Sequence, residues 1–173
     1  IQMRLGATVV LTRDTDVELD NEARAAVANN HQANLFISLH AGYSSNKLDS
    51  GSSIFVMKED FGGDFTPAAS PRDPLFLPWH LGYRAHRQAS GEAAKIFQEE
   101  LGKSAPAWKF PVRTAPLAVL ASAAAPALLL EIGNLNNEAN IQTLTDHGFQ
   151  TRLAGAIAEA IQRFADTPPG SAN

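Results

Sequence analysis

The stretch that decides the fold is residues 34–41, which reads Asn-Leu-Phe-Ile-Ser-Leu-His-Ala. Its apolar run has the length of one strand, and such runs are typical of strands buried on both faces of a sheet covered by helices. The run ends at His40, and Ala41 and Gly42 follow, where the chain can turn away. Ligand sites of open α/β sheets lie beyond the carboxyl ends of the strands. The sequence therefore predicts that His40 faces a cleft.

A second stretch repeats this design near the end of the chain. Residues 127–130 form an apolar run, which Glu131, Ile132 and Gly133 follow. The pattern predicts a second buried strand that delivers one ionisable side chain where the strand ends. We therefore expect His40 and Glu131 to form the chemical centre of the protein.

Outward from these two stretches, strands alternate with helices along the chain. This alternation predicts an α/β fold in one domain, with a mainly parallel sheet flanked by helices on both faces. We assign the domain to residues 1–166 and a tail or linker to residues 167–173. The expected strands cover residues 7–11, 34–41, 51–57, 116–120 and 127–132, and the small-residue stretch 121–125 precedes the last of them.

Helices are expected where apolar residues recur at helical spacing. Residues 1–6 are typical of the end of a helix, and Asp20 is expected to cap a helix that ends near Asn30. A helix over residues 90–101, a short one capped by Asn137 and a final one complete the set. The residues expected on inner faces are Ala23, Ala26, Val27, Ala93, Ile96, Phe97, Leu101, Leu153, Ile157, Ile161 and Phe164.

Composition excludes several classes of protein. The 173 residues suffice for one domain with a sizeable core, and the net charge of −4 argues against broad nucleic-acid binding. No apolar run is long enough to predict a membrane span. Cysteine is absent, so neither disulfides nor a thiolate metal site can form.

Residues 58–88 form an irregular, aromatic-rich insertion. Glycines and prolines interrupt it repeatedly, and long loops inside compact domains are usually functional or disordered. The aromatic residues favour packing against the domain, as a lid or as a wall of a substrate groove. A regulatory partner is expected to act through this insertion.

The residue types at the two strand ends suit hydrolysis. Zinc binds neutral imidazole and carboxylate well, and a catalytic zinc keeps one position open for water. A carboxylate nearby can take a proton from that water and pass it to a leaving amine. A histidine at a strand end is also commonly an ordinary hydrogen-bonded residue, so both interpretations stay open on residue types alone.

Four separated motifs resemble one family in order and approximate spacing. They are Val-Leu-Thr-Arg-Asp at 10–14, Arg24 with Ala28-Asn29, Leu-Phe-Ile-Ser-Leu-His-Ala at 35–41, and Pro-Ala-Leu-Leu-Leu-Glu-Ile-Gly-Asn-Leu-Asn-Asn-Glu at 126–138. Together, over residues 6–164, they resemble the zinc-dependent N-acetylmuramoyl-L-alanine amidases, also called amidase type 3.

The resemblance implies a reaction, a cofactor and a location. These enzymes cut the amide between N-acetylmuramic acid and the L-alanine of the peptidoglycan stem peptide, so peptidoglycan or muropeptides are the expected substrates. The family's strand-end histidine, a zinc ligand, falls on His40, and its catalytic glutamate falls on Glu131. The expected location is the cell envelope, either periplasmic or extracellular.

The sequence also departs from the family pattern. The family has two further zinc ligands, a histidine in an Asp-Pro-Gly-His-Gly motif and a glutamate at the start of the first helix. Neither is present in the 173 residues, and we expect both to lie upstream of Ile1. Two alternatives stay open: a non-catalytic cell-wall binding module derived from this family, and a zinc peptidase acting on other peptides.

The remaining polar candidates have structural interpretations beside functional ones. Arg13 and Asn134 are candidate substrate-binding residues, although for Arg13, as for Arg24, ion pairs that brace the loops are the favoured interpretation. His31 is expected at the surface or as a helix cap, and His147 as a helix C-cap. His80 and His86 are six residues apart, which fits neither a strand face nor a helix face, so ligation by them is not expected.

Overall fold

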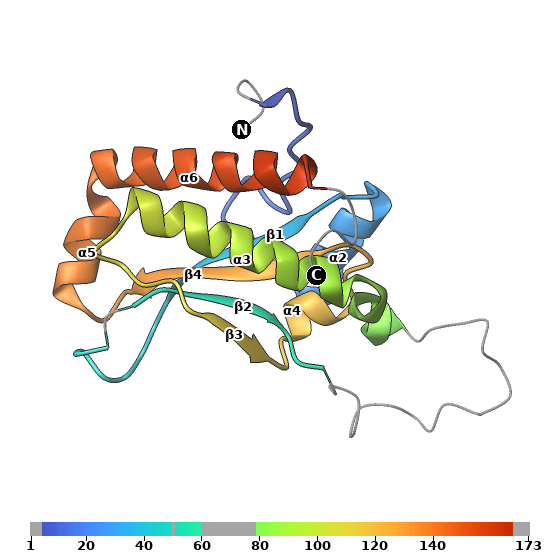
Figure 1. Cartoon of the computed structure of the whole chain (residues 1–173). Coiled ribbons are helices and arrows are strands. Elements are labelled where there is room, and N and C mark those ends of the chain that lie inside the picture. Colours follow the sequence, from blue (N-terminus) through green and yellow to red (C-terminus); the bar gives the residue numbers. More distant parts are fainter. Residues whose placement is uncertain (1–4, 50, 60–78, 168–173) are drawn as a thin grey trace, which may run out of the picture.

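The structure, a computed structural model, describes residues 5–49, 51–59 and 79–167. Figure 1 shows a layered arrangement of strands and helices. In chain order the elements are α2 (Asn21–Asn30), β1 (Phe36–Gly42), β2 (Ser53–Met57), the 3-10 helix η1 (Trp79–His86), α3 (Arg87–Ser104), β3 (Val112–Ala115), α4 (Ala118–Ala121), β4 (Ala127–Asn134), α5 (Glu138–Thr145) and α6 (His147–Ala165).

The described strands form one sheet in the order β1-β4-β2-β3. β1 runs parallel to β4 and β2 runs parallel to β3, whereas the central pair β2 and β4 is antiparallel. Helices lie on both faces of this sheet (Figure 1). The prediction of a single α/β domain with a mainly parallel sheet flanked by helices is therefore confirmed.

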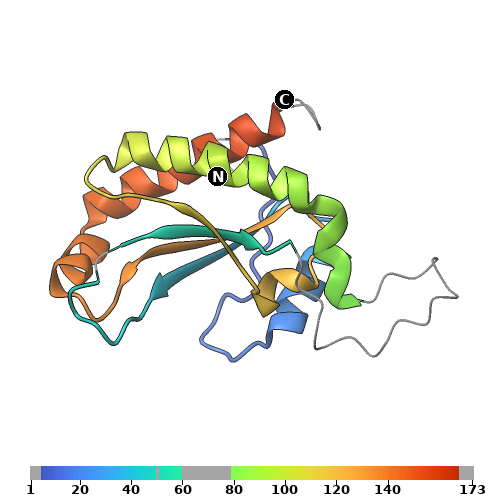
Figure 2. The same cartoon turned by 60° about the horizontal axis from the view of Figure 1, so that its bottom comes forward.

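One face of the sheet holds the main core, beneath α3 and α6. Figure 2 shows both long helices lying across this face. The side chains at its centre are fully buried: Ile54, Phe97, Leu101, Leu128 and Leu130. Each such side chain contributes about 1.5–3 kcal/mol by leaving water, so this layer dominates the stability of the domain. The predicted inner residues of α3 and α6 all belong to this cluster or pack against it.

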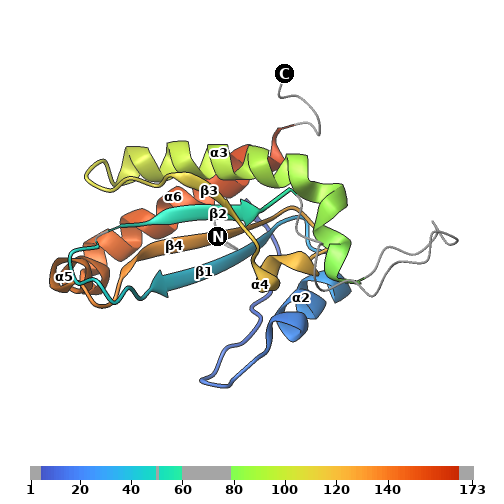
Figure 3. The same cartoon turned by 90° about the horizontal axis from the view of Figure 1, so that it is seen from below.

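The opposite face is covered at one end only, by α2, α4 and η1. Figure 3 looks onto this face and shows the strands uncovered toward the carboxyl ends of β1 and β4. A second, smaller cluster fills the covered end and includes Phe36, Met57 and Leu120. The uncovered end is where the two predicted strand-end side chains emerge.

β1 is less buried than its apolar run predicted. Phe36 is buried, but the side chain of Leu39 is 53% exposed. Among the described strands β1 pairs only with β4, so it is an edge of this sheet. Only its first half lies under helices, which is why the prediction of a strand buried on both faces is wrong for the second half.

Helix α2 begins as predicted but is rotated about its axis. Asp20 caps it, accepting a hydrogen bond from the backbone N of Ala23 at 2.6 Å. The buried positions are Ala25 and Ala28, whereas Ala23, Ala26 and Val27 are only half-buried. The reason lies in the Asn29 side chain, which forms two hydrogen bonds with the loop before β4 and so turns this face of the helix inward. Its Nδ2 donates to Ser122 O at 2.9 Å, and its Oδ1 accepts from Ala124 N at 2.8 Å.

Two predicted strands are absent from the described structure. Residues 7–10 alternate in exposure as a strand would, but residues 7–11 do not adopt a strand. Residues 116–120 are not a strand either, because β3 ends at Ala115 and α4 follows. Leu120 N donates to Leu117 O at 3.0 Å, which closes a helical turn whose alanines favour helix over strand.

The two C-terminal helices join more tightly than predicted. Asn137 caps α5 as expected, accepting from Asn140 N at 3.0 Å. Asp146 then caps α6 by accepting from Phe149 N at 2.6 Å. His147 is therefore the first residue of α6, and its prediction as a helix C-cap is wrong.

The insertion and the chain ends are described only in part. Residues 60–78 of the insertion lie outside the described residues, as do residues 1–4 and 168–173, on which the expected helix end and tail fall. The described parts of the insertion are residues 58–59, η1 and the start of α3, which begins at Arg87 rather than at the predicted Ser90. Gly6 has a φ of 62°, consistent with a helix C-cap. No helix among the described residues is long and apolar enough to cross a bilayer.

Candidate active site

The two predicted strand-end residues are neighbours across the sheet. His40 of β1 is the register partner of Glu131 of β4 in their parallel pairing. Side chains alternate between the faces of a strand, so His40 lies on the same face as Ser38, and Glu131 lies on that of Leu129. That face is the one left uncovered beyond α2 and α4 (Figure 3). His40 is exposed there and Glu131 is half-buried.

The ladder between β1 and β4 is irregular just beyond this pair. His40 pairs with Glu131 but Gly42 pairs with Asn134, so β4 has one residue more than β1 in this interval. Gly133, inside the interval, has a φ of 127°, which residues with side chains rarely adopt. Such bulges bend a strand and re-aim its side chains, and they are over-represented beside active sites.

His40 forms a hydrogen bond within β1, and its surroundings favour the neutral form of its imidazole. Its Nε2 shares a hydrogen bond of 2.9 Å with Oγ of the buried Ser38. Partial desolvation of the ring, followed by the positive charge of Arg24, lowers the pKa of His40 below its ordinary value. Glu131 opposes this shift and Arg13 adds to it. Neutral imidazole is the form that binds metals.

Both arginines brace the segment that precedes α2. Arg13 Nη1 donates to Val17 O at 2.6 Å, and Arg24 Nε donates to Leu19 O at 2.9 Å. Neither guanidinium is paired with a carboxylate within the described part of the chain, so the predicted ion pairs are replaced by bonds to backbone carbonyls. Both guanidinium charges contribute to the lowered pKa of His40, and substrate binding by Arg13 stays a prediction.

Asn134 has a structural task that sequence reasoning missed. Its side chain is buried and joins the loop after β4 to the loop after β1. Its Oδ1 accepts from Ser44 N at 3.0 Å and from Asn136 N at 2.9 Å, and its Nδ2 donates to Asp49 O at 2.7 Å. The run of asparagines after Gly133 was the sequence feature that could have indicated this role. Substrate binding by Asn134 stays a prediction, since these bonds engage its amide with the protein itself.

The other histidines lie elsewhere. His31 Nδ1 donates to Val27 O at 2.8 Å and caps α2, as predicted. His86 directly precedes α3, which meets the first residue of β4 through the hydrogen bond from Ala127 N to Ser90 Oγ. The side chain of His80 lies outside the described residues.

The described residues do not by themselves complete a catalytic zinc site. No group of three or more His, Cys, Asp or Glu side chains that could hold a metal occurs among them. A catalytic zinc takes three protein ligands, and the described site offers one imidazole and one carboxylate. His40 fits as one member of a donor set that these residues leave incomplete.

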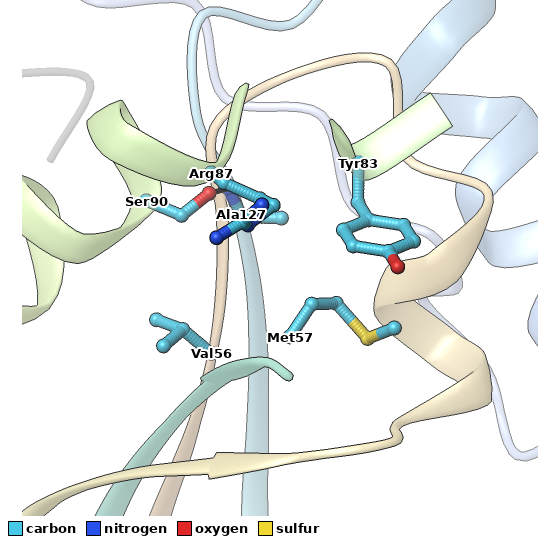
Figure 4. A pocket seen from close by; sticks show the side chains of 6 residues that line it. All are labelled: Val56, Met57, Tyr83, Arg87, Ser90 and Ala127. Atoms are coloured by element: carbon cyan, nitrogen blue, oxygen red, sulfur yellow. Dashed lines mark hydrogen bonds between the residues drawn. The ribbon is translucent and has the colours of Figure 1, made fainter. Parts of the chain in front are cut away.

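A cavity marks the opposite end of the sheet. It is lined by Val56, Met57, Tyr83, Arg87, Ser90 and Ala127 and measures about 10 Å³ (Figure 4). That volume holds at most one water molecule. Ala127 begins β4, whereas Glu131 lies near its end, so this cavity is separate from the site.

Comparison with solved structures places this arrangement among amidase domains. The catalytic domain of CwlV, an N-acetylmuramoyl-L-alanine amidase from Bacillus (Paenibacillus) polymyxa var. colistinus, is 27% identical with a TM-score of 0.71, over 93% of this chain and 74% of that one. AmiC2 of Nostoc punctiforme, an N-acetylmuramoyl-L-alanine amidase, is 20% identical with a TM-score of 0.73, over 96% and 77%. The CwlD amidase from Clostridioides difficile, solved in complex with the GerS lipoprotein, is 23% identical with a TM-score of 0.70, over 95% and 80%. No curated protein matches the chain at a significant level.

The fold is that of an α/β enzyme domain, and an imidazole and a carboxylate lie at neighbouring strand positions of its sheet. The family model described as N-acetylmuramoyl-L-alanine amidase matches residues 1–163, and the chain belongs to this family. It is therefore an amidase of the peptidoglycan hydrolase class, as the sequence motifs predicted.

Proposed function

We propose that Glu131 and His40 carry the amidase reaction, in which the bond between N-acetylmuramic acid and L-alanine is hydrolysed. The observation that supports this most is their pairing in register, which directs both side chains to the same face of the sheet, at the end that helices leave uncovered. Membership of the amidase family supplies the reaction. The register of β1 and β4 brings a carboxylate and an imidazole to neighbouring positions, which supports assigning the reaction to this pair.

Glu131 would move the proton that the reaction requires. Its carboxylate accepts a proton from a water molecule as the water oxygen bonds to the amide carbon. The carbon–nitrogen bond then breaks, and the same carboxyl group gives the proton to the nitrogen of L-alanine. The products are a free lactyl carboxyl group on the sugar and a peptide with a free amino terminus. The proton taken from the water is thus returned to the leaving nitrogen, and no further reactant is needed.

His40 is proposed as one ligand of a zinc ion. The family is generally zinc-dependent, and bound zinc would make the attacking water more acidic. The exposed, neutral imidazole of His40 fits this role. Because the described residues leave the donor set incomplete, the proton transfers above are derived from Glu131 alone.

Zinc content tests the proposed ligand directly. After the full-length protein is equilibrated with limiting zinc at neutral pH, we expect one zinc per molecule, lost in His40→Ala and kept in His31→Ala, whose ring caps α2 instead. Zinc retained in His40→Ala would exclude His40 as a ligand. A zinc-free full-length wild-type protein would favour the alternative of a cell-wall binding module that keeps the groove without the metal.

Product analysis tests the reaction itself. Incubation with a muropeptide should release a peptide with a free L-alanine amino group, detectable by mass spectrometry. Equal turnover of the same peptide without its muramyl group would favour the zinc peptidase alternative. Binding of peptidoglycan without any product would favour the binding module.

The cell envelope is the proposed place of action, because peptidoglycan lies there. We further propose that a protein partner regulates the enzyme, which the CwlD–GerS complex supports by analogy of fold. The insertion expected to mediate this lies largely outside the described residues. Fractionation of cells that produce the tagged full-length protein, followed by affinity purification from the envelope fraction, tests both proposals.

A further inference from the structure

Glu131 occupies the space that a side chain at residue 42 would fill. A Cβ atom built on Gly42 would lie 2.6 Å from the carboxyl carbon of Glu131 and 3.0 Å from its Cγ, with Oε1 closer still. Carbon atoms in van der Waals contact are about 3.5–4.0 Å apart. The end of the Glu131 side chain and any side chain at residue 42 therefore exclude each other.

The register of the strands explains this overlap. Gly42 follows His40 by two residues on β1, so a side chain at either position would point to the same face. Glu131 lies opposite His40 and reaches the diagonal position of Gly42, a distance that long side chains span. The carboxylate thus lies over the backbone of β1, just past the imidazole.

Backbone conformation does not account for the glycine at residue 42. Among the described residues the glycines with positive φ are Gly6 and Gly133, so the backbone of Gly42 has a conformation open to other residues. What distinguishes Gly42 is the missing side chain. Its neighbour Gly133 presents the opposite case, where a φ of 127° itself favours glycine.

We propose that Gly42 is a positioning residue for the amidase reaction, because its missing side chain leaves the space in which the Glu131 carboxylate lies beside His40. This inference rests on the proposed role of Glu131 as the base. An alanine at residue 42 would move the far end of a flexible side chain rather than backbone, so the fold should persist. The carboxylate would be displaced from the attacking water.

Steady-state kinetics on a muropeptide provide the first test. A displacement of about 1 Å in a reacting group can cost about 10²-fold in rate, so we expect kcat of Gly42→Ala to fall by about that factor while KM changes little. The matched control is Gly102→Ala in α3, where a Cβ would meet nothing within 4 Å. It should keep wild-type kcat. An unchanged kcat in Gly42→Ala would overturn the proposal.

Thermal unfolding provides a second test that needs no activity. In the wild-type background, Gly42→Ala should lower Tm by about 2–4 °C, because Glu131 must leave its place. In a Glu131→Ala background the same substitution should leave Tm unchanged or raise it, since replacing glycine restricts the unfolded chain. Equal Tm shifts in the two backgrounds would show that residue 42 and Glu131 are not coupled, and would refute the inference.

The two tests separate this inference from the proposed function. If Glu131→Gln keeps wild-type turnover, the role of Glu131 as the base fails, whatever happens at residue 42. If Glu131→Gln loses turnover while Gly42→Ala keeps it, the base is right and the positioning role is wrong. Loss of turnover in both, with coupled Tm shifts, supports both statements.

Discussion

The two ends of strand β4 differ in what their side chains do. At its start, Ala127 N donates to Ser90 Oγ at 2.9 Å, and Leu128 is fully buried between the helices and the sheet. The cavity beside this end holds no more than one water molecule. At its other end, Glu131 faces the uncovered part of the sheet, and the bulge at Gly133 follows it. The first half of this strand thus belongs to the core of the domain, and its second half presents Glu131, the proposed catalytic residue.

This difference predicts that stability and activity can be changed separately along one strand. Substitutions in the buried half should unfold the protein without altering the chemistry of the molecules that remain folded. Substitution of Glu131 in the open half should alter the chemistry at little cost in stability. The following experiments test this separation, from the largest expected change in stability to the smallest.

The largest loss of stability is expected from Leu128→Ala. The side chain is 0% exposed, and truncating such a residue costs about 2–5 kcal/mol through lost burial and the cavity left behind. Chemical denaturation measures this loss, and kcat per folded molecule should stay at the wild-type value. Leu135→Ala, just past the end of the same strand and 49% exposed, is the control and should cost far less. Equal losses would contradict the division of β4.

A smaller loss is expected from Asn134→Ala, where the open end of β4 holds its neighbouring loop. Removing the buried amide leaves the backbone N–H of Ser44 without its partner and should cost about 1–3 kcal/mol. Hydrogen exchange at Ser44 should accelerate, whereas Asn30→Ala, at an exposed position, should leave it unchanged. Unchanged protection of Ser44 would show that Asn134 does not hold this loop.

The smallest effect concerns Glu100, which lies away from both ends of β4 and joins α3 to α6. Lys103 Nζ donates to it at 2.8 Å, and Arg163 forms a hydrogen-bonded ion pair with it. These bonds, that of Lys103 first, lower the pKa of Glu100 in the folded protein. Its contribution is therefore complete above the unfolded pKa of about 4.3 and is lost as pH falls through the lower folded pKa.

Glu100→Gln should consequently lower the free energy of unfolding by about 1 kcal/mol at neutral pH, with the difference from wild type shrinking in acid. Denaturation across this pH range measures it, and Glu92→Gln, at a half-buried position of the same helix, serves as the control. A difference that grows in acid would show that the pKa of Glu100 is raised instead. No change in kcat is expected, because neither end of β4 is touched.

The sequence predicts the buried half of this molecule better than its loops. The apolar runs of β1 and β4 and the stripes of α3 and α6 were recognisable because burial imposes a regular pattern on residue types. The prediction of a strand over residues 116–120 was wrong because Val119 and Leu120 suit a strand locally. The helical turn of α4 that forms instead depends on contacts with distant parts of the chain. The rotation of α2 depends on Asn29, whose partners are more than ninety residues away.

The same distinction between local patterns and distant contacts applies to the candidate site. His40 and Glu131 could be predicted because each directly follows an apolar run. The relation between Gly42 and Glu131 could not, because it arises from strand register and a bulge that residue order does not reveal. The task of Asn134 was likewise hidden, since its partners belong to a different loop.

The most direct test of this account is the turnover of Glu131→Gln on a muropeptide, measured beside Glu138→Gln. Glutamine has nearly the same shape but cannot accept the proton, so kcat should fall by about 10²–10⁴-fold with no loss of stability. Glu138 is exposed in the first turn of α5, and its substitution should leave kcat unchanged. Wild-type turnover in a folded Glu131→Gln protein would contradict the claim that the open end of β4 carries the chemistry.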